Sequence, residues 1–241
     1  MTRNLARRIA QLLIGLVLYG IAIALMLRGA IGVEPWTVFS QGVARHLPLS
    51  IGVLTVAIGA LVLLAWIPLK QRPGIGTIAN VIVLGPAIDL GLLIVPPVEP
   101  LLPRIAIFAG GLLLLAVASG LYIGARFGPG PRDGLMTGLV ARTGRPIWMI
   151  RTGLEVTVLA IGWLLGGTVG LGTVAFAVLI GPLCNITIPL LRVPEPSGTA
   201  AAGATDGLIE AGAPHDERAA APRPVTTTAS AVPTDSEGSP S

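Results

Sequence analysis

The sequence predicts an all-α, polytopic membrane protein. Three observations support this fold class: the composition, six long apolar segments, and an internal repeat. Of the 241 residues, 53% are hydrophobic and only 12% are charged, and the mean hydropathy is +0.82. A soluble domain carries about 25% charged residues and could not bury this much apolar surface. A soluble enzyme is therefore excluded.

Six apolar segments are long enough to cross the hydrocarbon core, which takes about 17–25 helical residues. Their apolar residues are continuous rather than alternating, which favours helices over the strands of a membrane barrel. The first segment is longer than the apolar core of a signal peptide, so we interpret it as a span. The six predicted spans are 9–27, 49–69, 77–95, 105–125, 147–165 and 173–191.

Basic residues in the short connections predict the orientation of these spans. Cytoplasmic loops of membrane proteins are enriched in Lys and Arg. With the N-terminus inside, ten basic residues are cytoplasmic and three are external. Both termini are therefore predicted to be cytoplasmic. The ten are Arg3, Arg7, Arg8, Lys70, Arg72, Arg126, Arg132, Arg142, Arg145 and Arg192, and the three are Arg28, Arg45 and Arg104.

The C-terminal residues 193–241 differ in composition from the rest of the chain. They contain two basic and seven acidic residues and are dominated by Ala, Pro, Thr, Gly and Ser. Such a segment offers too little apolar surface to offset the entropy of ordering it. It is predicted to be a disordered, acidic cytoplasmic tail, either passive or regulatory.

An internal repeat appears when the sequence is shifted by 96 residues. Residues 8–89 align with residues 104–185 without a gap, and 21 of the 82 positions are identical. Many identities are Gly and Pro, which constrain the backbone and so indicate a shared shape. The chain therefore divides into a first repeat, 1–95, a second repeat, 96–192, and the tail, 193–241.

The two repeats are expected to lie in opposite orientations in the membrane. Each contains three predicted spans, and an odd number makes the second repeat enter from the opposite side. This arrangement is an inverted-topology repeat, with a pseudo-two-fold axis in the membrane plane. The distribution of basic residues agrees with it.

Three motifs carry a resemblance to a known family. Gly-Leu-Val-Leu-Tyr-Gly at 15–20, Gly-Val-Glu-Pro-Trp at 32–36 and Gly-Pro-Gly-Pro-Arg-Asp-Gly-Leu-Met at 128–136 resemble the YczE/YyaS/YitT family of bacterial integral membrane proteins, its YczE members most closely. The likeness covers residues 7–190. It implies several spans in a bacterial cytoplasmic membrane and an unassigned role that includes transport as one option.

Gly-Pro pairs occur at equivalent places in the third and sixth predicted spans. Gly85-Pro86 and Gly181-Pro182 are expected to kink these helices, because proline removes a backbone hydrogen bond. Interrupted helices at matching places in inverted repeats are typical of transporter binding sites. The alternative is a structural proline whose neighbours satisfy the freed carbonyl.

Polar residues near these pairs are candidate ligands for a solute or an ion. Asp89 and its equivalent, Asn185, lie three residues beyond each Gly-Pro pair, and Asn80 lies earlier in the same span as Asp89. A charged group inside the membrane is costly unless it is paired or hydrated, so Asp89 is a functional candidate. The alternative is that Asp89 lies close to the outer interface.

Arg151 and Glu155 are spaced four residues apart in the fifth predicted span, so they can pair on one helix face. They are a second candidate site. The alternative is a structural ion pair near the cytoplasmic interface, with Arg151 extending to the headgroups.

The long connections 28–48 and 126–146 are equivalent and lie on opposite sides. Each has a proline suited to a first helical turn, so each is predicted to hold a short interfacial or re-entrant helix. Arg132 and Asp133 begin the cytoplasmic one and are further candidate ligands. The alternative is an amphipathic helix on the membrane surface.

The residues contain no recognisable catalytic set, and no cofactor, metal or nucleic acid is expected. Cys184 is alone, so it forms no disulfide and no metal set. The expected function is a small secondary transporter or permease of an unknown small solute or ion, in a lipid bilayer. A homo-oligomer stays open. The alternative is a non-transporting scaffold or regulator acting through its cytoplasmic loop or tail.

Overall fold

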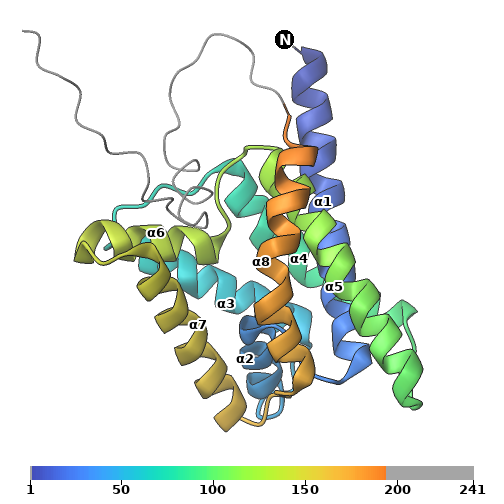
Figure 1. The fold of residues 1–241 in the computed structure, drawn as a ribbon. Helices are drawn as coiled ribbons and strands as arrows, with labels where there is room; N and C mark the ends of the chain where they lie inside the picture. Colours follow the sequence, from blue (N-terminus) through green and yellow to red (C-terminus); the bar gives the residue numbers. More distant parts are fainter. Residues whose placement is uncertain (1, 194–241) are drawn as a thin grey trace, which may run out of the picture. The chain divides into compact units, whose positions relative to one another are not determined.

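The computed structural model describes residues 2–193, and this range forms eight α-helices without a strand (Figure 1). The predicted all-α fold is confirmed. The predicted acidic tail lies outside the described residues from position 194 onward. The helices are α1 (Thr2–Gly29), α2 (Pro35–Ala44), α3 (Ile51–Trp66), α4 (Ile75–Ile94), α5 (Leu101–Gly124), α6 (Pro131–Thr143), α7 (Ile147–Leu164) and α8 (Leu171–Leu191).

Five helices in the described range are long and apolar enough to cross a membrane: α1 from Leu5, α4, α5, α7 and α8. The helix α3 is shorter than the predicted second span. Its 16 residues rise about 24 Å, against a hydrocarbon core of about 30 Å. Ser50 caps its beginning, and a turn with Lys70 at φ 54° follows its end. The protein is a polytopic helical membrane protein.

The order of helices repeats at the interval seen in the sequence. Helices α1–α4 are followed by α5–α8 at matching positions, about 96 residues later. The helices α4 and α8 begin alike: the N–H of Gly74 donates to Thr77 Oγ1 at 3.2 Å, and the N–H of Gly170 donates to Thr173 Oγ1 at 3.4 Å. The glycines occupy the N-cap positions, and the threonines follow in the first turn.

A contact that α1 makes with the end of α5 has an equivalent contact from α5 to the end of α1. Arg8 Nε donates to the carbonyl oxygen of Ala125 at 2.9 Å, and its equivalent, Arg104 Nε, donates to that of Gly29 at 2.9 Å. The N-terminal part of each helix thus contacts the C-terminal end of the other. The two helices are therefore antiparallel.

Glycines bring α1 and α5 together at two equivalent points. A Cβ on Gly15 would lie 3.2 Å from the carbonyl oxygen of Ala118, and one on Gly111 would lie 2.9 Å from that of Ala22. Each pair maps onto the other under the 96-residue shift. Small residues at such crossings allow membrane helices to approach closely.

The first turns of α4 and α8 repeat the same exchange. The N–H of Gly172 donates to the carbonyl oxygen of Ile31 at 2.8 Å, and the N–H of Gly76 donates to that of Phe127 at 2.9 Å. Each repeat therefore ties its fourth helix to the loop after the first helix of the other repeat. These reciprocal contacts are the pattern expected of approximate two-fold symmetry.

The two halves differ at the interface between their third and fourth helices. The helices α3 and α4 pack together, and a Cβ on Gly85 would lie 2.5 Å from the carbonyl oxygen of Gly52. Their equivalents, α7 and α8, do not pack along their lengths, and no atom lies within 4 Å of a Cβ placed on Gly181 (Figure 1). The residue equivalent to Gly52 is Trp148, whose side chain is exposed. The wide indole replaces the small residue that permits close packing.

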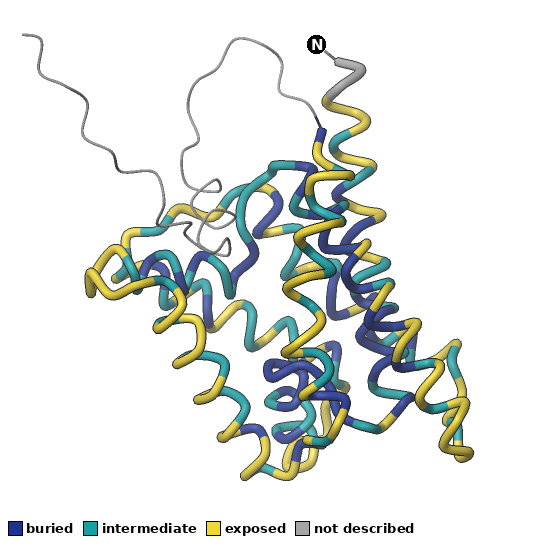
Figure 2. The backbone as a smooth tube through the Cα atoms, viewed as in Figure 1, coloured by how far each residue is buried: buried dark blue, intermediate teal, exposed yellow. Residues whose placement is uncertain are grey.

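The core lies between α1, α4 and α5, where Ile23, Ile88 and Leu115 are fully buried. Figure 2 shows α7 and α8 mostly exposed, in contrast to the buried inner face of α1. Exposed apolar side chains on these helices fit contact with lipid, whose tails are as apolar as the side chains.

The adjacent glycines of α5 provide a matched test of the α1–α5 crossing. The variant Gly111→Ala would press its methyl group against Ala22 and Met26 and is expected to lower stability by roughly 1–3 kcal/mol. The variant Gly110→Ala meets no atom within 4 Å and should be neutral or slightly stabilising. Thermal unfolding of the purified variants in detergent would measure both. Equal effects would contradict the crossing.

Candidate functional site

The short helices α2 and α6 begin close to each other. Each starts with a proline, Pro35 or Pro131, whose missing N–H costs nothing in a first helical turn. Each packs across to the other half, α2 on α7 and α6 on α3. Trp66 Nε1 donates to the carbonyl oxygen of Pro131 at 3.0 Å, which anchors the beginning of α6 on α3.

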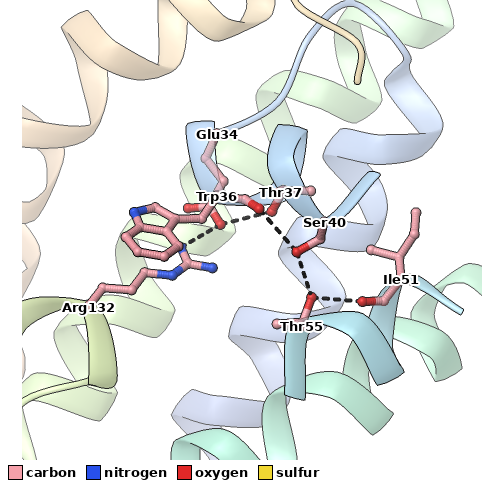
Figure 3. Close-up of polar contacts among 7 residues, drawn as sticks. All are labelled: Glu34, Trp36, Thr37, Ser40, Ile51, Thr55 and Arg132. Atoms are coloured by element: carbon pink, nitrogen blue, oxygen red, sulfur yellow. Dashed lines mark hydrogen bonds and ion pairs between the residues drawn. The ribbon is translucent and has the colours of Figure 1, made fainter. Parts of the chain in front are cut away.

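An ion pair joins the two helix beginnings. Arg132 Nη1 lies 2.8 Å from Glu34 Oε1, and Thr37 Oγ1 donates to the same oxygen at 2.9 Å (Figure 3). The Glu34 residue is only 3% exposed. A buried carboxylate needs such partners, because removing it from water costs several kcal/mol. The ion pair therefore holds the N-terminal ends of α2 and α6 together.

Arg132 also lies over the ring of Trp36, 5.0 Å from its centroid. These two residues are 96 positions apart, so they are equivalent in the two halves. Their contact marks the place where the halves meet. Figure 3 shows the guanidinium beside both the indole and the Glu34 carboxylate.

A cavity of about 90 Å³ lies beside this junction. Its aromatic walls are Tyr19, Trp36 and Tyr122, and its charged residues are Arg132 and Asp133. Helices α1–α6 all contribute to it. Its remaining polar side chains are Ser40, Thr55 and Asn80.

Hydroxyl groups on the α2–α3 side of the cavity are already bonded. Ser40 Oγ donates to the carbonyl oxygen of Trp36 at 3.1 Å, and Thr55 Oγ1 donates to that of Ile51 at 2.8 Å (Figure 3). A longer contact of 3.5 Å joins the two hydroxyls. These side chains give the wall a fixed polar surface.

The residues that α5 and α6 contribute to the cavity include a hydroxyl without a partner. Tyr122 is 5% exposed, and its hydroxyl has no hydrogen-bond partner among the described residues. Asp133 accepts a hydrogen bond from the backbone N–H of Gly130, as a helix-capping carboxylate does. Burial raises the pKa of the Asp133 carboxyl, while Arg151 and Arg132 act in the opposite direction. The Tyr122 hydroxyl is therefore a cavity-lining polar group without a partner among the described residues.

Three of the predicted site residues line the cavity together: Asn80, Arg132 and Asp133. Arg151 and Glu155 lie on α7, outside the lining. In the described part of the chain, no ion pair joins these two. Glu155 is half-buried and interacts electrostatically with Glu34 and Arg132.

Asp89 and Asn185 lie away from the cavity. Asp89 Oδ1 accepts from the N–H of Gly52 at 2.9 Å, and Oδ2 accepts from Ser50 Oγ at 2.5 Å. Asp89 therefore satisfies donors at the beginning of α3. Asn185 is exposed on α8.

The Gly-Pro pairs lie inside helices that continue through them. The helix α4 runs from Ile75 to Ile94 with Pro86 inside it, and α8 likewise contains Pro182. Of the glycines, Gly85 packs against α3, whereas Gly181 faces open space. The pairs therefore differ in surroundings despite their identical sequence.

Sequence reasoning missed Glu34, Tyr19 and Tyr122. Glu34 is the only acidic residue before Asp89, which was a usable signal for a buried charge in this apolar chain. The two tyrosines offered no signal, because the other residues that line the cavity with them come from distant segments.

Comparison with known proteins identifies the family. The sequence pattern of a family of unknown function, DUF6198, matches residues 6–189. The chain belongs to the DUF6198 family. This match covers both repeats and all the helices that line the cavity.

Three relatives of this DUF6198 protein support the assignment. An uncharacterized protein of Haemophilus influenzae is 39% identical over 78% of this chain and 87% of its own length. The uncharacterized membrane protein YczE of Bacillus subtilis is 33% identical over 73% of this chain and 82% of its own length. The uncharacterized protein YyaS of the same organism is 24% identical over 74% of this chain and 91% of its own length. The resemblance to YczE and YyaS is confirmed. No solved structure matches the chain.

The ion pair of this DUF6198 protein should show strong coupling between its partners. The variant Arg132→Met leaves the Glu34 carboxylate buried without a counter-charge and should cost about 3 kcal/mol. Adding Glu34→Gln should recover most of that loss. Thermal unfolding of the two single variants and the double variant gives the coupling energy. Additive losses would contradict the pairing.

Proposed function

We propose that the protein is a small secondary transporter of a small solute or ion, which binds in the cavity between the two halves. The observation that carries the proposal is the difference between equivalent helix pairs: α3 and α4 are packed, whereas α7 and α8 are apart. Transporters with inverted repeats work by exchanging such arrangements around a central site. The proposal involves no chemical step.

The proposed topology is six spans in two inverted repeats of three. The antiparallel contact of α1 with α5 supports it, because equivalent helices of an inverted repeat run in opposite directions. The short helix α3 would cross with local thinning of the bilayer, at a modest cost per ångström. The excess of basic residues in alternate connections supports cytoplasmic termini in a bacterial cytoplasmic membrane.

The position of the cavity also supports a transport site. Two short helices enter from opposite sides of the proposed topology, and their N-termini meet at Glu34 and Arg132. Helix N-termini carry partial positive charge and are recurrent binding elements at the middle of transporters. The lining comes from both halves, so a movement of one half against the other would change access to it.

Disulfide trapping tests the proposed exchange. In the structure, Val56 touches Gly85, and the equivalent residues in the second half, Thr152 and Gly181, belong to helices that are apart. In a Cys184→Ala background, the double variant Thr152→Cys with Gly181→Cys should form a disulfide in native membranes, because α7 closes on α8 in the alternate state. Mass spectrometry of the linked peptides would detect it.

The double variant Gly59→Cys with Val81→Cys is the positive control. A Cβ on Gly59 lies 3.4 Å from Val81 Cγ2 in the packed α3–α4 pair, so the two positions are neighbours in the structure. If this control pair forms its disulfide and the α7–α8 pair never does, the exchange does not occur. That result would favour a non-transporting scaffold.

Labelling from the two faces tests the inverted topology without knowledge of the substrate. Leu47 and Thr143 are equivalent positions, and both are exposed at the ends of the short helices. In the Cys184→Ala background, Leu47→Cys should react with an impermeant maleimide on intact cells. Thr143→Cys should react only after permeabilisation. Reaction of both from one face would contradict the inverted repeat.

A further inference from the structure

We propose that the cavity binds a monovalent metal cation between the carboxylate of Asp133 and the hydroxyl of Tyr122. Binding of the ion at this site does not depend on the proposed function. Passage of the ion through the protein rests on the proposed function. Binding itself can be measured separately.

The two oxygens converge on Gly130 at the beginning of α6. A Cβ on Gly130 would lie 2.8 Å from Tyr122 Oη and 3.2 Å from Asp133 Oδ2. The two oxygens therefore face one small space, which only the missing side chain of Gly130 keeps open. The backbone of Gly130, with φ −65°, would accept any residue. Glycine is thus needed here for space and not for conformation.

The hydroxyl of Tyr122 indicates a missing partner. A buried polar group without a hydrogen bond costs about 1–3 kcal/mol, so such groups are rare unless a water or an ion completes them. Tyr122 is 5% exposed, its hydroxyl is unpartnered, and the residue lines the cavity. A ligand beside Asp133 would supply the missing partner of the Tyr122 hydroxyl.

The charges around the cavity favour a cation. Three carboxylates interact electrostatically here, those of Glu34, Asp133 and Glu155, with only two guanidinium groups, those of Arg132 and Arg151. Arg132 is already paired with Glu34. Counted over side chains, the cluster therefore holds one carboxylate more than it holds guanidinium groups, and a further cation would balance it.

The donor set and the space favour a monovalent metal ion. Asp133 supplies one carboxylate and Tyr122 a neutral hydroxyl oxygen near it, and Asn80 supplies an amide oxygen elsewhere in the cavity lining. Divalent cations in proteins usually take more oxygen ligands and several carboxylates. A volume of about 90 Å³ is on the order of three water molecules, enough for a partly hydrated Na⁺ or K⁺.

Ion-dependent thermal stability tests the site. Purified protein in detergent is melted in NaCl or KCl, replaced at constant ionic strength by N-methyl-D-glucamine chloride, whose cation is too large for the cavity. A ligand that binds only the folded state raises the melting temperature, so we expect a saturable rise of roughly 3 °C or more with Na⁺ or K⁺.

The variant Tyr122→Phe separates binding from folding. It removes only an unpartnered hydroxyl, so it should melt at or above the wild-type temperature in N-methyl-D-glucamine chloride. The rise with Na⁺ or K⁺ should be lost. Asp133→Asn and Gly130→Ala should lose it too, the latter because its methyl group fills the space. Gly110→Ala, which meets no atom within 4 Å, is the matched control and should keep the rise.

Three results would overturn the inference. They are an equal melting temperature in all three salts, a rise that Tyr122→Phe retains, and a response to pH alone, which would assign the excess charge to a proton. A positive α7–α8 disulfide with no ion effect would remove only this inference. An ion effect without that disulfide would instead remove the proposed transport.

Discussion

The crossing of α1 and α5 is the contact on which the rest of the structure depends. Gly15 and Gly111 let the two backbones approach, and Arg8 and Arg104 close the ends of the crossing. Equivalent residues exchange places across it, so the crossing relates the two halves by an approximate two-fold symmetry. It places α4 beside α1 and α8 beside α5, and leaves α2 and α6 to reach the opposite halves.

The central ion pair follows from that arrangement. Two short helices begin at the junction, and their N-termini carry partial positive charge. The Glu34 and Asp133 carboxylates lie at these N-termini, and Arg132 joins the two helices through Glu34 and Trp36. A cavity with polar and charged residues in its lining results, and residues of both halves contribute to it.

The sequence predicted the fold class from its composition and long apolar segments. It predicted the repeat because glycine and proline, which constrain the backbone, recur at equivalent positions. It also placed Arg132, Asp133 and Asn80 among the site residues, and these meet in the cavity. It could not place Asp89, because the donors that Asp89 satisfies belong to the beginning of α3, 37 residues away. Nor could it find the open pair α7–α8. One difference there is Trp148 where the first half has Gly52, and the importance of that glycine shows only in its tertiary contact with Gly85.

Distances between spin labels on the two equivalent helix pairs test the central claim most directly, which is that the halves exchange arrangements around one cavity. Ala60 with Ile82 reports on α3–α4, Val156 with Val178 reports on α7–α8, and all four side chains are exposed. Electron–electron double resonance in lipid nanodiscs should show two distances for each pair. A condition that favours the short distance in one pair should favour the long distance in the other. A single, unchanging distance in both pairs would contradict the account.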